Sequence, residues 1–285
     1  MYPRLKPARV ALTVIALLLL TACQGGTGSS SSAAPSGSTP ESATIQRIQE
    51  AGVLKVGAAI AMPTLGKDPE TNEYIGAGTL IAEELADRLG VTVQYLDQDW
   101  SIIPAGIQSG TIDISVAGLW VTEERLTALG MTPWWQAGFC YFALKDNNKV
   151  GAAADINDPD VVVATFEGSG TYQSVSKAYP DATYVTRPEI PGEYSAITEL
   201  LAHEADIAPI DSTMVNVFLE RYDQLKVIPA DCATNPDIPA WVGVAYTKDD
   251  SAFKAYMDSM IDEMQPELKA ALAEFLKSEW MSIGL

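Results

Sequence analysis

The sequence predicts an α/β protein with two lobes, and three observations lead to this prediction. The chain has 285 residues, which is more than one average domain. Helical and strand patterns alternate with short links, an order that implies parallel strands. The alternation starts again after about residue 160, so that two α/β units of comparable size follow one another. A cleft between two such units is the usual place for a small ligand.

The first unit begins with a helix that Ser42 can cap and Gly52 can end. The next helix places its leucine and isoleucine side chains on one face and ends before Gly90. Short apolar runs between the helices are typical of buried strands. The expected elements of this unit are helices over residues 42–51, 79–89 and 102–109, and strands over residues 54–58, 91–95, 112–116 and 138–144.

The second unit repeats the alternation, and Pro266 divides its last helical stretch into two predicted helices. The chain shows no short-period repeat. The expected strands cover residues 161–164, 183–185, 207–210, 225–228 and 241–246, and the expected helices cover residues 169–178, 193–203, 213–222, 251–264 and 266–277.

The first 22 residues are typical of a secretory signal peptide. Arg4, Lys6 and Arg9 precede an apolar run over residues 10–20 that is shorter than a membrane-spanning helix. The sequence Leu-Thr-Ala-Cys that ends at Cys23 resembles a bacterial lipobox, in which the cysteine is acylated. A permanent membrane anchor is the alternative. The acylated Cys23 and a flexible tether rich in Gly and Ser over residues 23–40 would hold the folded body outside the cytoplasm at the cell membrane.

Charge and composition exclude several classes of function. The 18 basic and 37 acidic residues give a net charge of −19, which argues against nucleic-acid binding and against attachment to anionic lipids. The single histidine, His203, argues against most zinc sites and catalytic triads. We expect no metal and no cofactor. Cys140 and Cys232 form an even pair in an oxidising compartment and can form a disulfide, with two buried free thiols as the alternative.

A candidate carboxylate-binding residue follows the third predicted strand. Thr122 can cap a short helix that opens with two glutamates, which places Arg125 at the carboxyl edge of the sheet. Open α/β sheets bind ligands at this edge, and the arginine fork donates two parallel hydrogen bonds to a carboxylate. The alternative is a surface arginine that balances Glu123 and Glu124.

Two further candidates lie in the second unit. Ser169 and Gly170 open a helix whose N–H groups can attract an anion, although a tight strand-to-helix turn explains them equally well. Asp211 ends a strand and can either cap the next helix or accept hydrogen bonds from a cationic group. Trp100 and Trp120, at expected strand ends, can meet a ligand, whereas we expect Trp135 and Trp241 to pack in the core.

Several stretches, taken in order, resemble the bacterial extracellular solute-binding proteins of family 3, the amino-acid-type receptors of ABC importers. The resemblance runs from about Leu54 to the C-terminal helices. The matching stretches are VLKVG at residues 53–57, ADRLGV at 86–91, WSIIPAGIQSG at 100–110, AGLWVTEER at 117–125, GSGT at 168–171 and ADIAPID at 205–211.

The resemblance implies a two-lobed periplasmic-binding-protein-like fold of type II, with a mixed sheet in each lobe and the ligand cleft between the lobes. Lobe one would cover residues 41–136 and 243–285, and lobe two residues 140–238. The segments near residues 135–139 and 236–242 would form the hinge.

The resemblance also implies roles for single residues. Arg125 would clamp a ligand carboxylate, and the backbone N–H groups of Ser169 and Gly170 would close on it from the other lobe. Asp211 would take the ligand amino group, and Trp100 would stack on the ligand. The remaining candidates, Gly118 and Trp120, lie in the matching stretch at residues 117–125.

The chain departs from the family pattern in ways that bear on the ligand. The loop after the first strand, AAIAMP at residues 58–63, has neither the usual acidic residue nor the usual aromatic one. A tryptophan, Trp120, stands where a threonine is common. We therefore expect an apolar and aromatic pocket. Such a pocket suits a ligand with an apolar side chain or an alkylated or cyclic cationic zwitterion, and ectoine-like solutes are one candidate.

The resulting prediction is a monomeric, lipid-anchored receptor that binds a small zwitterionic solute and delivers it to an ABC permease. Two alternatives from other classes remain. One is an enzyme on the same fold, dehydratase-like or glycan-cleaving, which would need a positioned acid–base pair. The other is a ligand sensor that acts through a signalling partner.

Overall fold

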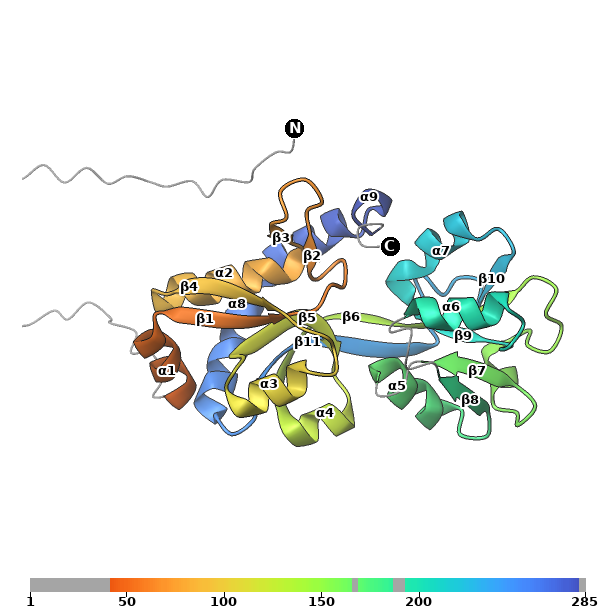
Figure 1. The fold of residues 1–285 in the computed structure, drawn as a ribbon, viewed down its shortest axis with the longest axis horizontal. Coiled ribbons are helices and arrows are strands. Elements are labelled where there is room, and N and C mark those ends of the chain that lie inside the picture. Colours follow the sequence, from red (N-terminus) through yellow and green to blue (C-terminus); the bar gives the residue numbers. More distant parts are fainter. Residues whose placement is uncertain (1–41, 166–168, 187–192, 282–285) are drawn as a thin grey trace, which may run out of the picture. The chain divides into compact units, whose positions relative to one another are not determined.

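The computed structural model describes residues 42–165, 169–186 and 193–281 as a mixed α/β structure (Figure 1). The strands are β1 (Val53–Ala58), β2 (Gly66–Lys67), β3 (Tyr74–Ile75), β4 (Thr92–Asp97), β5 (Ile114–Trp120), β6 (Leu129–Leu144), β7 (Val162–Thr165), β8 (Thr183–Thr186), β9 (Ala208–Asp211), β10 (Leu225–Ile228) and β11 (Ile238–Thr247).

The α-helices alternate with these strands, and two short 3₁₀ turns, η1 (Ala153–Ile156) and η2 (Ser212–Met214), complete the order. The α-helices are α1 (Ala43–Ala51), α2 (Ala77–Leu89), α3 (Ile103–Ser109), α4 (Glu123–Ala128), α5 (Gly170–Ala178), α6 (Glu193–Leu201), α7 (Val215–Arg221), α8 (Ser251–Phe275) and α9 (Ser278–Met281).

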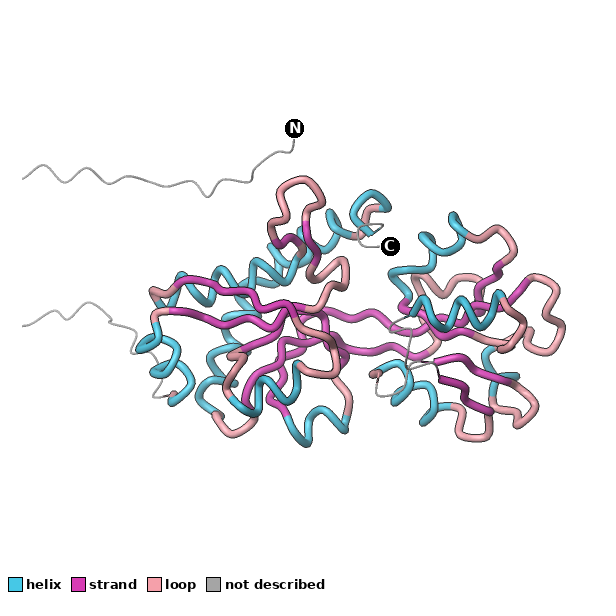
Figure 2. Tube along the Cα trace, viewed as in Figure 1, coloured by secondary structure: helices cyan, strands magenta, loops and turns pink. Residues whose placement is uncertain are grey.

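One mixed sheet carries most of the strands, in the order β10-β6-β11-β5-β1-β4, with β9 paired to β6. Strand β1 runs parallel to β4 and β5, whereas β6 and β11 pair antiparallel along nearly their whole length. These two long strands lie between β9 and β10 on one side and β5, β1 and β4 on the other (Figures 1 and 2). The predicted α/β class with mixed sheets is confirmed.

Buried side chains gather in three clusters. The largest joins α1, α2, α3 and α8 to β1 and β5, and includes Ile48, Leu85 and Met257. The other two lie among elements from β6 to β11, one around Phe142 and Phe218 and one around Phe139, Tyr141 and Val163. The division of the chain into two lobes and a hinge stays a prediction.

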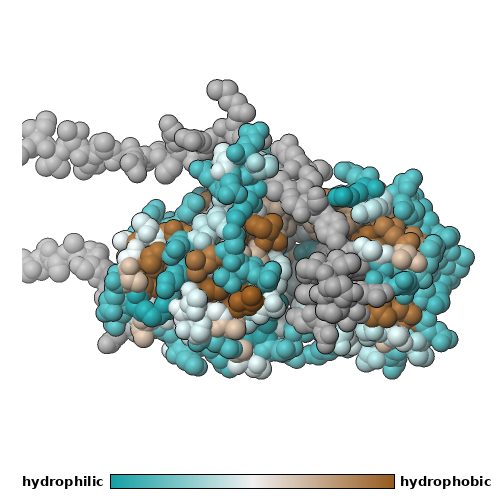
Figure 3. Space-filling model, viewed as in Figure 1, coloured by the Kyte–Doolittle hydropathy of each residue, from teal (hydrophilic) through white to brown (hydrophobic). Residues whose placement is uncertain are grey.

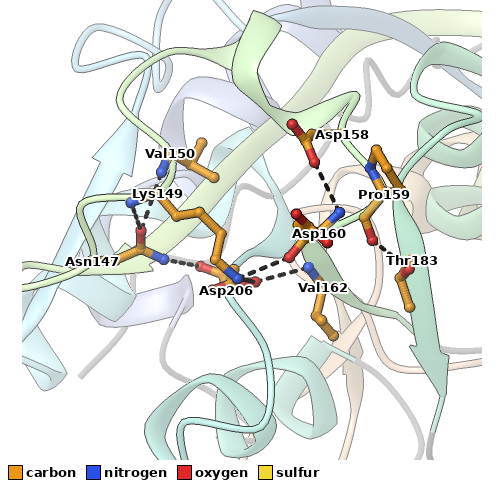
Figure 4. A network of polar contacts seen from close by, with 9 residues as sticks. All are labelled: Asn147, Lys149, Val150, Asp158, Pro159, Asp160, Val162, Thr183 and Asp206. Carbon is orange, nitrogen blue, oxygen red and sulfur yellow. Dashed lines mark hydrogen bonds and ion pairs between the residues drawn. The ribbon is translucent and has the colours of Figure 1, made fainter.

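A polar network fixes the start of β7 (Figure 4). The Asp206 carboxylate accepts hydrogen bonds from Lys149 Nζ at 2.7 Å and from the N–H of Val162 at 2.9 Å. Asn147 donates to the carbonyl of Asp206 at 3.0 Å and accepts the N–H groups of Lys149 and Val150. One loop thereby holds the segments that enter β7 and β9 side by side.

Cys140 of β6 and Cys232, which follows β10, are joined by a disulfide with Cα atoms 5.7 Å apart. Both cysteines are fully buried. The bond ties the C-terminal part of β6 to the loop that leads into β11, next to the first pair of the two strands, Phe139 and Ile238. Cys23, the predicted lipidation site, lies outside the described residues.

Two sequence predictions about elements are wrong, and one hairpin was missed. The two predicted C-terminal helices form one helix, α8, that continues through Pro266. The apolar residues Met260, Met264 and Leu268 pack into the core on both sides of the proline, and this packing outweighs the roughly 3 kcal/mol that an interior proline costs. The hairpin of β2 and β3 was not predicted because each of its strands has only two residues.

The third correction concerns β6 and its tryptophans. This strand starts at Leu129 and not at Gly138, so Trp134 and Trp135 lie inside it. Pro133 is tolerated because it lies where the pairing with β11 shifts register. Trp241, expected in the core, is 48% exposed because the alternation along β11 turns its neighbour Val242 inward instead.

Helices α1 and α8 share one carboxylate at their starts. Asp250 accepts hydrogen bonds from Ser42 Oγ at 2.7 Å, from the N–H of Thr44 at 2.9 Å and from the N–H of Phe253 at 2.8 Å. Partial burial raises the pKa of Asp250, but these three hydrogen bonds outweigh it and lower the pKa to about 2. The ionised carboxylate therefore stabilises the folded state.

We expect Asp250→Asn to lower the free energy of unfolding at pH 7 by about 1 kcal/mol, after allowance for solvent screening, or roughly 2–4 °C in melting temperature. Because the folded pKa is depressed, this stabilisation is present above the unfolded pKa of about 4 and is lost as the pH falls toward 2. Urea unfolding at pH 7 and pH 3 checks the effect. Asp249→Asn, at an exposed neighbouring position, should have no effect, and an equal loss in that control would contradict the assignment.

Candidate functional site

The carboxyl ends of three parallel strands meet at one edge of the sheet. Ala58 ends β1 opposite Asp97, which ends β4, and β5 ends at Trp120. Open α/β sheets bind ligands at this edge, because backbone groups and the following loops converge there. The predicted residues Trp100, Trp120 and Arg125 all lie at these strand ends or in the segments that follow them.

Arg125 is positioned by the short helix that follows β5. Thr122 caps α4 as predicted, and its Oγ1 accepts the N–H of Arg125 at 3.2 Å. The guanidinium folds back toward the strand, where Nη1 donates to the carbonyl of Trp120 at 2.9 Å. The side chain of Arg125 is therefore held at the strand end and does not extend into solvent.

The guanidinium of Arg125 is desolvated, and no carboxylate of the described residues forms an ion pair with it. Burial lowers its pKa to about 10, an effect that Glu124 opposes only in part, so the group stays charged at neutral pH. Within residues 42–165, 169–186 and 193–281, no carboxylate forms an ion pair with Arg125. A guanidinium has five N–H donors, and the carbonyl of Trp120 is the acceptor that the described part of the chain provides.

Trp120 lies between β6 and the start of α5. Its ring packs on Phe139 with centroids 4.7 Å apart. On its other side is Gly170, where an added Cβ would lie 2.9 Å from the Cβ of Trp120. Gly170 therefore allows an approach that a larger residue would obstruct, and the structure brings Trp120, Arg125 and Gly170 together.

Ser169 caps α5 and its Oγ accepts the N–H of Tyr172 at 3.0 Å. The hydroxyl is thus used within the helix, while helix geometry leaves the first N–H groups of α5 without intrahelical acceptors. Lys177 of α5 also pairs with Glu123 of α4 at 2.7 Å, a second link between α5 and the elements around Arg125. Glu167 and Gly168, which precede the cap, lie outside the described residues.

Asp211 ends β9 beside the same aromatic residues. It pairs with Phe139 in the sheet, and its Oδ1 accepts both the N–H and the hydroxyl of Thr213 at 2.9 Å. Burial raises the pKa of Asp211 to about 6, against the lowering effect of Thr213. Asp211 thus caps η2, the structural role that the sequence also allowed. Its raised pKa places the titration of the carboxylate just below neutral pH.

Gly118 and Trp100 have other neighbours. Gly118 has φ +84° and faces Thr64, whose Oγ1 would lie 2.5 Å from an added Cβ, so the position needs glycine for packing. Trp100 lines a hollow of about 410 Å³ at the ends of β1 and β4. Asp97 and Asp99 line the same hollow.

These two aspartates are not among the residues predicted from the sequence, because the predicted second strand ends at Tyr95. The strand continues to Asp97, which pairs with Ala58 at the edge of the sheet. The signal that could have located them is the position of the Asp-Gln-Asp-Trp run directly after an apolar strand.

In the described segments, no group of histidine, cysteine, aspartate and glutamate side chains is arranged to hold a metal ion. In the same segments, no helix combines the length and the apolar character that a membrane crossing requires.

Comparison with known proteins places the chain. A curated relative, cyclohexadienyl dehydratase from Pseudomonas aeruginosa, is 24% identical over 243 residues, which cover 83% of this chain and 87% of the relative.

Two solved structures share the fold. An ancestral amino-acid-binding protein, a precursor of cyclohexadienyl dehydratase, has a TM-score of 0.67 and 26% identity, with 82% of this chain and all of that chain covered. An arginine-bound variant of ArgBP from T. maritima has a TM-score of 0.63 and 24% identity, with 77% and 99% covered. The first is named as an amino-acid-binding protein and the second as arginine-bound. The family model of the bacterial extracellular solute-binding proteins, family 3, matches residues 54–278, and the chain belongs to this family.

Proposed function

We propose that the protein is the lipid-anchored receptor of an ABC importer and binds a small amino-acid-like zwitterion between its two lobes. The observation that carries the proposal is the desolvated guanidinium of Arg125, which has no counter-ion among the described residues. A buried charge without a partner is costly, so a site that keeps one is suited to a ligand of opposite charge. A carboxylate matches the fork of the guanidinium with two parallel hydrogen bonds.

The other end of the zwitterion would meet Asp211. Its buried carboxylate can accept hydrogen bonds from an ammonium group, and the bound cation would favour the ionised form of the carboxylate. The N–H groups at the start of α5 would add to the carboxylate side. The names of the two structural neighbours, one amino-acid-binding and one arginine-bound, support this class of ligand.

The groups that would hold the ligand come from both predicted lobes, so the ligand would hold the two lobes together. Arg125 and Trp120 belong to the predicted lobe one, whereas Gly170 and Asp211 belong to the predicted lobe two. A ligand that contacts both sets shifts the population toward the closed form, which a permease could then recognise. The contact between Trp120 and Gly170 would limit how closely the lobes approach.

Amino acids, betaines and ectoines, tested one by one on a protein that starts at Glu41, should include a ligand that raises the melting temperature. At 100 times its dissociation constant the ligand adds about 2.7 kcal/mol, a shift of roughly 5–10 °C for a body of this size. Arg125→Ala should abolish the shift, and Arg88→Ala, a matched change on α2 away from the site, should keep it.

A shift that persists in Arg125→Ala would contradict the carboxylate anchor. The dehydratase among the relatives defines the enzymatic alternative. Mass spectrometry of the ligand recovered after incubation separates the two functions, because a receptor returns its ligand unchanged and a dehydratase releases water from it.

Gly170→Ala should weaken ligand binding about tenfold, because the new methyl group would lie 2.9 Å from the Cβ of Trp120. The same change in a Trp120→Gly background, which removes that Cβ, should cost little, and this coupling is measured by titration calorimetry on the four variants. Gly151→Ala is the control, since its nearest neighbour would be 3.6 Å away. An equal loss in both backgrounds would assign the effect to the helix start and not to the Trp120 contact.

Cys23→Ser should release the full-length protein from the membrane fraction of a bacterial host. The reason is that acyl chains on this cysteine would supply the membrane affinity of a body with an acidic surface. Fractionation followed by immunoblotting measures the change. Membrane attachment that survives the substitution would favour an uncleaved N-terminal helix as the anchor.

A further inference from the structure

A carboxylate at the start of β11 receives two tyrosine hydroxyls. Asp237 directly precedes β11, and its Oδ2 accepts a hydrogen bond from the hydroxyl of Tyr141 at 2.8 Å and another from that of Tyr179. Hydrophilic residues cover much of the described surface in Figure 3, so the exposed carboxylate of Asp237 is ordinary by itself. The convergence of two hydroxyls on it is not, because Tyr141 is fully buried and Tyr179 is partly buried.

Both tyrosines are protonated donors at neutral pH. Burial raises the pKa of Tyr141 well above its ordinary value, and the hydrogen bonds with Tyr179 and Asp237 act in the same direction. Burial and the hydrogen bond to Asp237 raise the pKa of Tyr179 to about 12, although the hydrogen bond with Tyr141 opposes this rise. Hydrogen bonds to an ionised carboxylate are stronger than neutral ones, so Asp237 holds both side chains firmly.

Tyr179 is the residue at which α5 ends. Its N–H donates to the carbonyl of Val175 at 2.9 Å, and its ring packs edge to face on Tyr141 with centroids 5.7 Å apart. The hydroxyl of Tyr184 on β8 lies within hydrogen-bond distance of the carbonyls of Val175 and Tyr179, at 3.1 and 2.8 Å. The C-terminal end of α5 is therefore fixed to β6, to β8 and to the residue before β11.

The opposite end of α5 carries groups that are proposed to meet the ligand. Ser169 and Gly170 open the helix there. The nine residues of α5 span about 13 Å, so a tilt of roughly 10° at the Tyr179 end would move Gly170 by about 2 Å. Groups that bind a ligand must be held within about 0.5 Å of their productive positions. The first N–H groups of α5 can therefore serve a ligand only while the direction of the helix is fixed.

The contacts at the two ends of α5 meet at Phe139. The N–H of Asp237 donates to the carbonyl of Phe139 at 3.2 Å, and the carboxylate of Asp237 holds Tyr179 at one end of α5. At the other end, Gly170 lies against Trp120, whose ring packs on the ring of Phe139. Both ends of the helix are thus placed relative to one residue of β6.

We propose that Asp237 is a positioning residue for ligand binding. Through Tyr141 and Tyr179 it sets the direction of α5, and thereby the place of the N–H groups at Ser169 and Gly170. The proposal rests on the function proposed above, in which these N–H groups meet the ligand carboxylate. Asp237 itself does not touch the ligand and acts only through the helix.

Variants of Asp237 on the protein from Glu41 onward test this role by titration calorimetry. The probe is the amino acid, betaine or ectoine that raises the melting temperature most. Asp237→Ala removes the acceptor and should weaken binding about tenfold, whereas Asp237→Asn keeps an acceptor oxygen and should cost no more than about threefold. Tyr179→Phe, which keeps the ring, should weaken binding less than Asp237→Ala and add little to it in the double variant, because both act through one hydrogen bond.

Asp206→Ala is the matched control for a loss of stability. It also removes a carboxylate with two hydrogen bonds, but at the start of β7 and away from α5. This variant should lower the melting temperature and keep the affinity within about twofold of the unaltered protein. Equal losses of affinity in Asp206→Ala and Asp237→Ala would overturn the positioning role, because any destabilised variant would then bind as weakly.

Amide hydrogen exchange on the ligand-free protein gives a second readout. Asp237→Ala should speed the exchange of the N–H groups of Gln173 and Tyr179, which are bonded within α5, about tenfold, and Asp206→Ala should not. Faster exchange with unchanged affinity would leave Asp237 a structural residue and overturn the proposal while the proposed function stands. If no solute binds the unaltered protein, the proposed function is contradicted and the positioning role falls with it.

Discussion

The account depends on one positive charge, on Arg125, that burial desolvates and that no carboxylate in the described part of the chain neutralises. Arg125 is fixed by a helix cap on one side and by the carbonyl of Trp120 on the other, and burial already lowers its pKa to about 10. Such a group costs folding free energy while it lacks a partner. A ligand carboxylate would recover that cost on binding, so the same feature that weakens the empty protein would give the ligand its affinity.

The surrounding strands hold the residues next to Arg125 in fixed positions. Strands β6 and β11 run antiparallel through the middle of the main sheet, and the buried disulfide of Cys140 and Cys232 fixes β6 to the segment before β11. Phe139, next to that disulfide, carries the ring of Trp120 on one side and pairs with Asp211 on the other. The groups proposed to meet the two ends of a zwitterion are thus connected through one strand.

Local signals in the sequence were enough to predict the parts of the fold and of the site that depend on backbone rules. Ser42 and Thr122 cap their helices as expected, since capping is decided within four residues. Features that depend on packing escaped prediction: α8 passes through Pro266 because core contacts outweigh the proline, and Trp241 is exposed because β11 turns Val242 inward. The pair of aspartates after β4 was missed because a strand end cannot be located within two residues from its pattern alone.

The most direct test of the central claim changes the ligand and not the protein. The amino acid that binds best is compared with its C-terminal amide, which keeps the shape and removes the negative charge, by titration calorimetry at neutral pH. The amide would leave the buried guanidinium of Arg125 without its partner, and removing one member of a buried ion pair costs about 3 kcal/mol or more. We therefore expect the amide to bind at least about a hundredfold more weakly than the acid. An amide that binds as tightly as the acid would contradict the role of Arg125 as a carboxylate anchor.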